Sequence, residues 1–465
     1  MWTSINQALN IIDNFVWGVP LMVLIIAGGL LLTIRLGLLQ IRKLPLALKW
    51  MLQNEEGGKG EISSFSALCT ALSATIGTGN IVGVATAVCA GGPGALFWMV
   101  VAAFLGMATK YSEGLLAVKY RTVAEDGHSL GGPFYYIELG MGKNFKWLAK
   151  IFAFFGVCVG LFGIGTFSQV NGISSAVHGF FDPNDAFTVK ILPFLGEYSW
   201  SVVIASLILS FCVAAVLIGG VKRIASVSQI IVPFMAVIYF VFAVILICCN
   251  ITKVPAAFAT IVTAAFSPKA ITGGAVGSML IAMQKGVARG IFSNEAGLGS
   301  APIAAAAAQT NSPVRQGLVS MTGTFIDTII ICTLTGLSIV LTGAWQVEGL
   351  EGVQVTTYAF QHGLPFPAQF SSFILMLCLV FFAFTTILGW DYYSERCLEY
   401  LSGGNMKHVK IFRWIYILAV FIGPYMTVSA VWTIADIFNG LMAIPNMIAL
   451  FALSGVIVKE TRAFF

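Results

Sequence analysis

The chain has 465 residues, of which 58% are hydrophobic and only 10% are charged, and its formal net charge is +5. A soluble domain carries about 25% charged residues, so these few ionisable side chains could not cover a soluble surface. The composition therefore excludes a soluble enzyme or binding domain and indicates an integral membrane protein within a lipid bilayer. The basic residues lie in short segments between apolar runs and form no cluster, so they do not indicate nucleic-acid binding.

Eleven apolar stretches of a length suited to membrane-spanning helices follow one another along the chain. Before them, Ile5, Leu9, Ile12 and Val16 recur at helical spacing, which predicts a short helix on the membrane surface. The sequence thus predicts an all-α integral membrane protein with 11 transmembrane helices. The predicted spans are residues 17–35, 65–90, 93–119, 147–174, 200–219, 227–250, 275–308, 317–343, 369–390, 411–426 and 429–458.

Lysine and arginine are divided unevenly between the two sides of these spans. Cytoplasmic loops of membrane proteins carry an excess of basic residues, so the first loop, with Arg42, Lys43, Lys49 and Lys59, is placed inside. Alternation then puts most other basic residues on the same side. We therefore predict a multi-pass protein of the cell (inner) membrane, with its N-terminus outside and its C-terminus in the cytoplasm.

Two predicted spans are interrupted by glycines and polar residues. The second contains Gly77-Thr78-Gly79-Asn80, and the seventh has a similar mixture between residues 286 and 299. Glycine costs about 1 kcal/mol relative to alanine inside a helix, so such clusters mark places where a helix opens. Lipid cannot satisfy the freed backbone groups, which must face protein or a polar cavity.

The two interrupted spans each begin a group of five spans. Because five is odd, the second group enters the membrane from the opposite side, which makes the groups an inverted repeat. Matching breaks in the two halves indicate a binding site near the middle of the membrane. The predicted organisation is residues 1–63 for the surface helix, first span and cytoplasmic loop, 64–250 for the first repeat, and 274–458 for the second.

The first break offers two kinds of ligand. Unpaired N–H groups at the start of the following half-helix suit a carboxylate, and carbonyls at the end of the preceding half-helix, such as those of Ser73 and Ile76, suit a small cation. The alternative is that Gly79 and Gly83, spaced as GxxxG, only allow close helix packing. Thr78 and Asn80 beside these glycines favour a binding break.

Around the second break, Phe292, Ser293 and Asn294 are candidates for pocket wall and ligands, and Gln284 is more ambiguous. Charged side chains in this segment must face protein or water. A purely structural alternative for Glu295 is a salt bridge with Arg289 or another cation.

An acidic residue, Asp327, lies about 13 Å into the eighth span, close to the middle of the membrane. It could neutralise a bound Na⁺, carry a proton, or pair with Lys285 or Arg289. The sequence alone leaves these three roles open.

The ninth span carries Thr385 and Thr386, whose hydroxyls could complete a cation site or only bond to carbonyls in the preceding turn. Trp390 could wall a small pocket or anchor the helix at the membrane interface. Gln169, Asp436 and Asn439 are weaker candidates for polar ligands.

No metalloprotease, nucleotide-binding or serine-hydrolase motif is present in the sequence, which argues against an enzyme. Without an ATP-binding motif, any uphill transport must draw on an ion gradient. A channel is a second alternative, but a channel needs a continuous pore with repeated rings of ligands, whereas one pair of breaks gives a single site.

Two long motifs resemble those of a known family. Residues 74–85, followed by 91–94 and Trp98, are similar to the signature of the alanine/glycine:cation symporters, also called sodium:alanine symporters. Residues 286–302 are similarly typical of that family.

The resemblance implies a leucine-transporter-type fold, a 5+5 inverted repeat with one extra N-terminal helix. It also implies Na⁺- or H⁺-coupled symport of alanine or glycine by alternating access, with no cofactor besides the coupling ion; another small amino acid is the alternative substrate. The implied Na⁺ ligands are the carbonyls of Ser73 and Ile76 and the hydroxyls of Thr385 and Thr386. The resemblance also implies that Thr78 and Gly79 receive the substrate carboxylate. It implies a second cation near Asn80, Ser293 and Asp327, and a pocket whose size is limited by Phe292 and Trp390.

Overall fold

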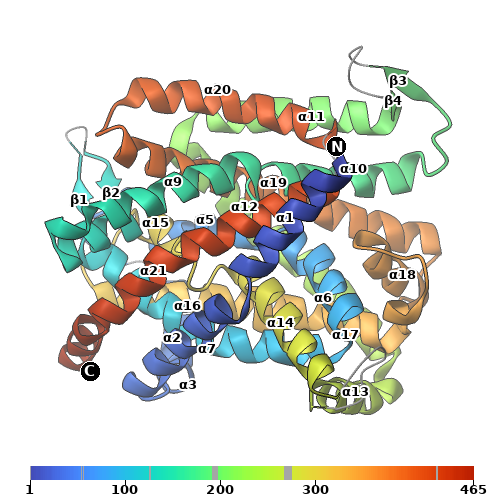
Figure 1. The fold of residues 1–465 in the computed structure, drawn as a ribbon, viewed down its shortest axis with the longest axis horizontal. Helices are drawn as coiled ribbons and strands as arrows, with labels where there is room; N and C mark the ends of the chain where they lie inside the picture. The colour runs from blue at the N-terminus through green and yellow to red at the C-terminus, as the bar shows by residue number, and fades with distance from the viewer. Residues whose placement is uncertain are drawn as a thin grey trace.

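The computed structural model describes residues 2–53, 55, 57–124, 127–190, 197–266, 275–425 and 428–465. These residues are mostly helical, with two short antiparallel hairpins at the periphery (Figure 1). The predicted first residue of the second repeat, 274, lies outside the described residues.

The first part of the chain contains thirteen α-helices among the described residues. They are α1 (Trp2–Val16), α2 (Val19–Arg35), α3 (Leu39–Arg42), α4 (Leu44–Met51), α5 (Ser64–Thr75), α6 (Val84–Gly91), α7 (Gly94–Lys119), α8 (Pro133–Tyr135), α9 (Lys146–Phe162), α10 (Phe167–Phe181), α11 (Trp200–Leu217), α12 (Gly220–Cys249) and α13 (Val254–Phe266). Short π- or 3₁₀-helical segments are η1 (Gly79–Gly83), η2 (Tyr136–Met141), η3 (Lys143–Phe145) and η4 (Ile251–Lys253). The strands are β1 (Thr122–Val123), β2 (Ser129–Leu130), β3 (Thr188–Lys190) and β4 (Glu197–Ser199).

The rest of the chain is helical in its described residues. Its α-helices are α14 (Ala275–Asn294), α15 (Ala301–Ala305), α16 (Pro313–Thr324), α17 (Thr333–Thr342), α18 (Val353–Gly363), α19 (Ala368–Leu401), α20 (Met406–Ile422) and α21 (Val428–Phe464). The segments η5 (Phe325–Cys332), η6 (Ala344–Gln346) and η7 (Gly423–Tyr425) complete it.

Both predicted helix breaks are present. The α5 and α6 helices form one apolar pair bent by 52° at residues 76–78. The α14 helix ends at Asn294, and a non-helical segment separates it from α15. The second break therefore begins after Asn294, and Phe292 lies in the last turn of α14.

Among the described residues, eight helices are long and apolar enough to cross a membrane, or nine with the bent α5–α6 pair. The predicted count of eleven spans stays a prediction. The fourth predicted span, residues 147–174, was wrong in extent: its helices α9 and α10 are interrupted at residues 163–166 and continue to Phe181. The interruption allows a close approach, because a Cβ on Gly165 would lie 2.7 Å from the Cβ of Trp390 in α19.

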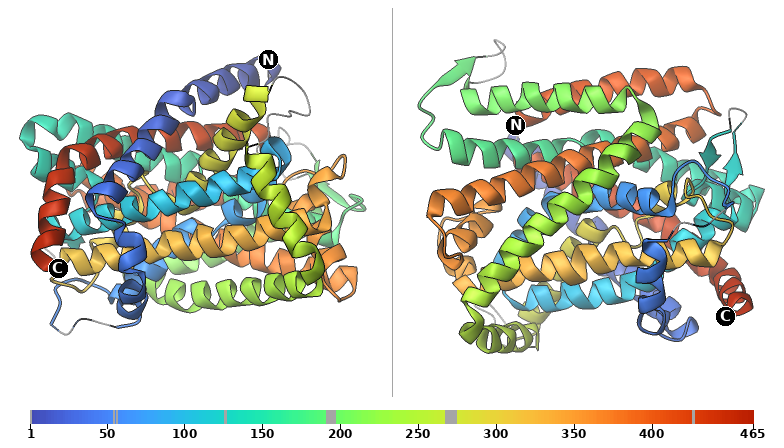
Figure 2. Two further views of the ribbon diagram at one scale, coloured as in Figure 1. Left: turned by 90° about the horizontal axis from the view of Figure 1, so that it is seen from below. Right: turned by 180° about the vertical axis from the view of Figure 1, so that it is seen from behind.

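Long helices surround the two breaks. The α7 helix packs against α14 and α16, whereas α19 packs against α5, α9 and α10. The right-hand view of Figure 2 shows α12, in light green, crossing obliquely in front of the other helices, and it contacts α5 and α19. The breaks are thus enclosed by protein, as the polar backbone of an interrupted helix requires.

Candidate functional site

The first break is held open by side chains that replace helical hydrogen bonds. Asn80 Oδ1 accepts a hydrogen bond from the Gly77 N–H at 2.8 Å, and Gln169 Oε1 in α10 accepts one from the Thr78 N–H at 3.0 Å. The Thr78 hydroxyl is buried without a hydrogen-bond partner among the described residues. A buried hydroxyl without a partner is costly, so Thr78 is suited to receive a ligand.

The second break is fixed by a buried carboxylate and a buried amide. Glu295, Gly297 and Gly299 have positive φ angles of 57°, 91° and 83°, which explains why the helix cannot continue. Glu113 in α7 accepts a hydrogen bond from the Gly297 N–H at 3.1 Å, and Asn446 in α21 donates to the Gly297 carbonyl at 2.9 Å. The backbone of the break is therefore satisfied by α7 and α21.

The two breaks contact each other. A Cβ on Gly79 would lie 3.2 Å from the Cα of Ser293 and 3.3 Å from Cδ1 of Phe292. Glycine at this position therefore allows η1 to lie directly against the end of α14. The structure brings together the break residues that the sequence had placed in different halves.

A buried polar cluster occupies this junction. The Asp327 carboxylate, in η5, accepts hydrogen bonds from Asn80 Nδ2 at 2.7 Å, Ser293 Oγ at 2.8 Å and Thr328 Oγ1 at 2.7 Å. Asn294 Nδ2 extends the cluster by donating to Thr328 Oγ1 at 3.0 Å. Local π-helical geometry such as that of η5 is frequent at functional sites.

One of the two candidate threonines reaches the first break. The Thr386 hydroxyl lies 3.3 Å from the Ile76 carbonyl while also donating to Phe382 in its own helix. The Thr385 hydroxyl instead donates to the preceding turn and lies 3.6 Å from Met235 Sδ. The hydroxyl of Ser73 donates to the Thr70 carbonyl at 2.8 Å. The oxygens of Ile76 and Thr386 are thus adjacent, and the Thr385 hydroxyl lies apart from them.

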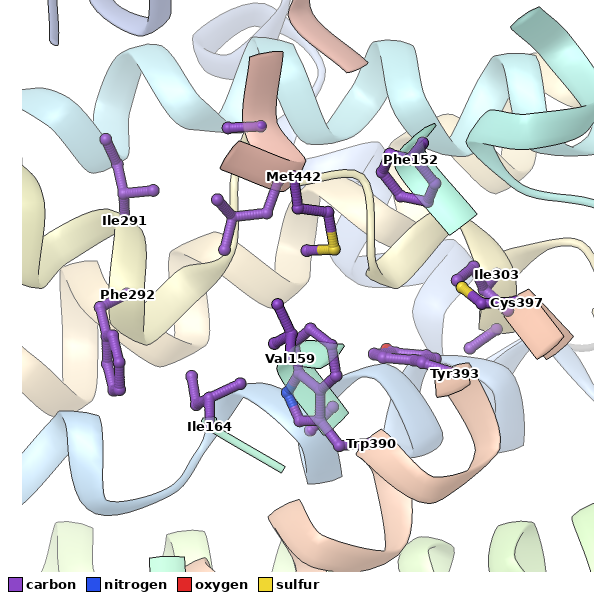
Figure 3. Close-up of a cluster of buried hydrophobic side chains, with 14 of the residues drawn as sticks. Phe152, Val159, Ile164, Ile291, Phe292, Ile303, Trp390, Tyr393, Cys397 and Met442 are labelled. Carbon is purple, nitrogen blue, oxygen red and sulfur yellow. The ribbon is translucent and has the colours of Figure 1, made fainter. Parts of the chain in front are cut away.

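Two large aromatic residues flank the breaks. Trp390 is fully buried and donates its indole N–H to Glu295 Oε1 at 2.8 Å. The interfacial-anchor alternative for Trp390 is therefore wrong. In the view of Figure 3, Ile164 lies between Trp390 and Phe292, and all three residues belong to one cluster of buried hydrophobic side chains.

Arg289 pairs with a different acidic residue from the two alternatives considered for it. Arg289 forms a two-bond pair with Asp436 in α21, at 3.0 and 2.7 Å, so its predicted alternatives with Glu295 and Asp327 are wrong. Among the described residues Asp327 makes no ion pair. The Arg289 guanidinium also lies 5.4 Å from the ring centre of Phe292.

Gln284 is separated from the other candidates. Its amide donates to the Trp17 carbonyl at 3.2 Å, which joins α14 to the connection between α1 and α2. At 1.5 Å per residue this places it about 13 Å along α14 from Ser293.

Sequence reasoning did not single out Glu113, Asn446, Thr328 or Lys110. Glu113 and Lys110 lie within the third predicted span, where an ionisable residue is itself a signal of function. Asn446 and Thr328 join the site through contacts with residues far away in the sequence. No comparable local signal in the sequence marks them.

Comparisons with known proteins show the family of the chain. Residues 2–465 match the family model described as the sodium:alanine symporter family. The sodium/alanine symporter AgcS of Methanococcus maripaludis is 47% identical over 98% of this chain and 96% of its own length. An uncharacterised transporter of Haemophilus influenzae is 55% identical over 99% and 96%, and the probable sodium/glutamine symporter GlnT of Bacillus subtilis is 36% identical over 100% and 91%.

A solved structure shares the fold. The transporter MhsT, crystallised in complex with L-phenylalanine, superposes with a TM-score of 0.54 over 88% of this chain and 99% of its own, at 11% identity. This likeness confirms the predicted leucine-transporter-type fold.

Proposed function

This chain belongs to the sodium:alanine symporter family, and on that premise we propose that it takes up alanine together with Na⁺ by alternating access. The protein is a secondary active transporter with several membrane spans, and its family consists of symporters rather than enzymes. Glycine is a second candidate substrate because it presents the same ammonium and carboxylate groups. We place the protein in the cell (inner) membrane with its N-terminus outside.

The observation that carries the proposal is the contact between two broken helices beside the adjacent oxygens of Ile76 and Thr386. Na⁺ would bind the carbonyls of Ser73 and Ile76 with the Thr386 hydroxyl, which lies 3.3 Å from the Ile76 oxygen. Such a site would tie the end of α5 to α19. Oxygen atoms of this kind are the ligands that hard cations prefer.

The substrate would bind between the two breaks. Thr78 and Gly79 would receive its carboxylate at the start of η1, where backbone N–H groups favour an anion. Asn80, Ser293 and Asp327, joined by hydrogen bonds of 2.7 and 2.8 Å, would hold a second cation beside it. Gln169, Asn294 and Phe292 would complete the surroundings. The site would then close over substrate and Na⁺ as one helix bundle rocks against the other.

Thr386→Ala tests the Na⁺ site. Removal of one neutral ligand oxygen should raise the Na⁺ concentration for half-maximal alanine uptake by about fivefold, since such a contact contributes about 1 kcal/mol. The measurement is uptake of labelled alanine into proteoliposomes over a range of external Na⁺. The same vesicles should respond to an imposed Na⁺ gradient and not to a pH gradient alone.

Thr385→Ala is the matched control on the same helix. Its hydroxyl faces Met235 and its own preceding turn, so its loss should leave the Na⁺ response within about twofold of wild type. An unchanged Na⁺ response in Thr386→Ala, or an equal change in both variants, would contradict the proposed site.

Trp390→Ala tests the limit on substrate size. Loss of the buried indole should let larger amino acids compete with alanine, with inhibition by leucine strengthened by about tenfold. Trp390→Phe separates bulk from hydrogen bonding, because it keeps most of the ring volume and loses only the N–H bond to Glu295. If Trp390→Ala and wild type have the same selectivity, Trp390 does not line the substrate pocket.

A further inference from the structure

The backbone conformation of Glu295 distinguishes this residue from the rest of the second break. Its φ angle of 57° is one that side chains rarely adopt, and it carries a steric strain that glycine would avoid. Glycines with positive φ, Gly297 and Gly299, already serve this purpose two and four residues later. The other non-glycine residues with positive φ in the described part of the chain, Leu38 and Asp185, are exposed, whereas Glu295 is fully buried. A glutamate at such a position indicates that its side chain has a use.

The carboxyl group of Glu295 joins three elements of the structure. Its Oε1 atom accepts the hydrogen bond from the indole N–H of Trp390 in α19, and its Oε2 atom accepts one from the hydroxyl of Ser300, directly before α15. Glu295 itself directly follows α14. Because donors from two different elements engage the two oxygens, the carboxyl group is held in one orientation.

The hydrogen bond fixes the position of the indole ring. The N–H is the only hydrogen-bond donor of a tryptophan side chain. The neighbouring Tyr393 contacts Trp390 edge-on, with ring centres 5.5 Å apart, and both belong to the apolar cluster drawn in Figure 3. Apolar contacts are not directional, so a ring held by them alone could shift. The bond to Glu295 therefore decides where the indole lies.

We propose that Glu295 is a positioning residue that sets the size limit on the substrate, by holding the Trp390 indole in place relative to Phe292. The inference rests on the proposed function, in which both aromatic residues limit the substrate pocket. Phe292 lies three residues before Glu295, in the last turn of α14, whereas Trp390 is on α19. The hydrogen bond thus ties one wall of the pocket to the segment that carries the other wall. A larger amino acid would need the indole to move, which this bond opposes.

Glu295 also has a competing structural role. It interacts electrostatically with Lys110 in α7, and so does Glu113, which accepts a hydrogen bond in the same break. Glu295 could therefore serve only to balance a buried charge and to satisfy buried donors. That role predicts less folded protein, or less uptake of every substrate. Positioning of the indole instead predicts a changed preference between small and large substrates.

The experiment measures how unlabelled leucine and unlabelled alanine inhibit uptake of labelled alanine into proteoliposomes, and it compares the ratio of the two inhibition constants. Glu295→Gln keeps the size of the side chain but has a single acceptor oxygen for two donors. Leucine should become a better inhibitor relative to alanine by about fivefold. The effect should be smaller than in Trp390→Ala, because the ring is released and not removed.

Glu113→Gln is the matched control for charge. It removes a second carboxyl group that interacts with Lys110, and the hydrogen bonds of Glu113 run to Gly297 and Asn446. Its ratio of inhibition constants should stay within about twofold of the wild-type ratio, whatever its effect on the amount of folded protein.

A double variant tests whether Glu295 acts through Trp390. Trp390→Phe removes the same hydrogen bond from its other end, so adding Glu295→Gln to Trp390→Phe should change the ratio by less than about twofold. A merely structural role of Glu295 predicts that the two substitutions act independently and that their effects multiply.

A wild-type ratio in folded Glu295→Gln would overturn the inference, as would independent effects in the double variant or an equal change in Glu113→Gln. Should Glu295→Gln fail to fold, Glu295→Asp decides by the same ratio, because it keeps the carboxyl group but withdraws it from the indole by one methylene group. Failure of the proposed function looks different: the wild-type protein would then take up no alanine, or Trp390→Ala would keep the wild-type ratio.

Discussion

Asp327→Asn is expected to reduce Na⁺-driven alanine uptake by more than about a hundredfold, because each hydrogen bond to a buried charged group contributes about 1.5–3 kcal/mol. The carboxylate accepts hydrogen bonds from Asn80, Ser293 and Thr328. An asparagine amide would direct its own N–H groups at some of these donors and would remove the negative charge that a second cation needs. Initial rates of labelled alanine uptake, normalised to folded protein, measure the effect.

The same variant separates two roles of the carboxylate. If Asp327 neutralises Na⁺, the residual uptake of Asp327→Asn should have lost its Na⁺ dependence. If it carries a proton, an imposed pH gradient should drive wild-type uptake without Na⁺, and the variant should lose that response. A pH dependence that persists in Asp327→Asn would exclude the proton role, and wild-type Na⁺ dependence in the variant would exclude the Na⁺ role. Thr328→Ser, which keeps the hydroxyl donor, is the control.

The breaks could be predicted from sequence because their signal is local. Glycines beside Asn80 or Ser293 have no place in an ordinary apolar span, and both segments interrupt their helices. The meeting of Asn80, Ser293 and Asp327 followed from the family resemblance, and hydrogen bonds of 2.7 and 2.8 Å join them. The structure thus places these three residues together, while their roles remain proposals.

Contacts that close over long distances could not be predicted in this way. Arg289 pairs with Asp436, which lies 147 positions away in the sequence, instead of with a nearby acid. Adjacent threonines on a helix point about 100° apart, so Thr385 and Thr386 need not both face the break, and the sequence does not say which one does. Glu113 fixes Gly297 across 184 positions, a contact that only packing of α7 against α14 creates.

Gly77→Ala is expected to lower the affinity for Na⁺ by between about tenfold and a hundredfold, since overpacking of a filled interior costs about 1–3 kcal/mol. A Cβ on Gly77 would lie 2.5 Å from Thr386 Oγ1 and 3.0 Å from Gln169 Oε1. The added methyl group would therefore push apart the hydroxyl that we assign to the cation and the amide that holds the break. Na⁺-dependent alanine binding to purified protein measures the loss.

Gly83→Ala separates this effect from simple helix packing. On the same segment, a Cβ on Gly83 would have its nearest neighbour, Arg289 Cδ, at 4.0 Å, so an alanine fits there. If Gly83 served only close packing, in the GxxxG motif that it forms with Gly79, Gly83→Ala should reduce the amount of folded protein and leave its Na⁺ affinity unchanged. If the break is a binding site, Gly83→Ala should resemble wild type, whereas Gly77→Ala should fold and have a lower affinity for Na⁺. A Gly77→Ala protein with wild-type Na⁺ affinity would remove the first break from the ion site.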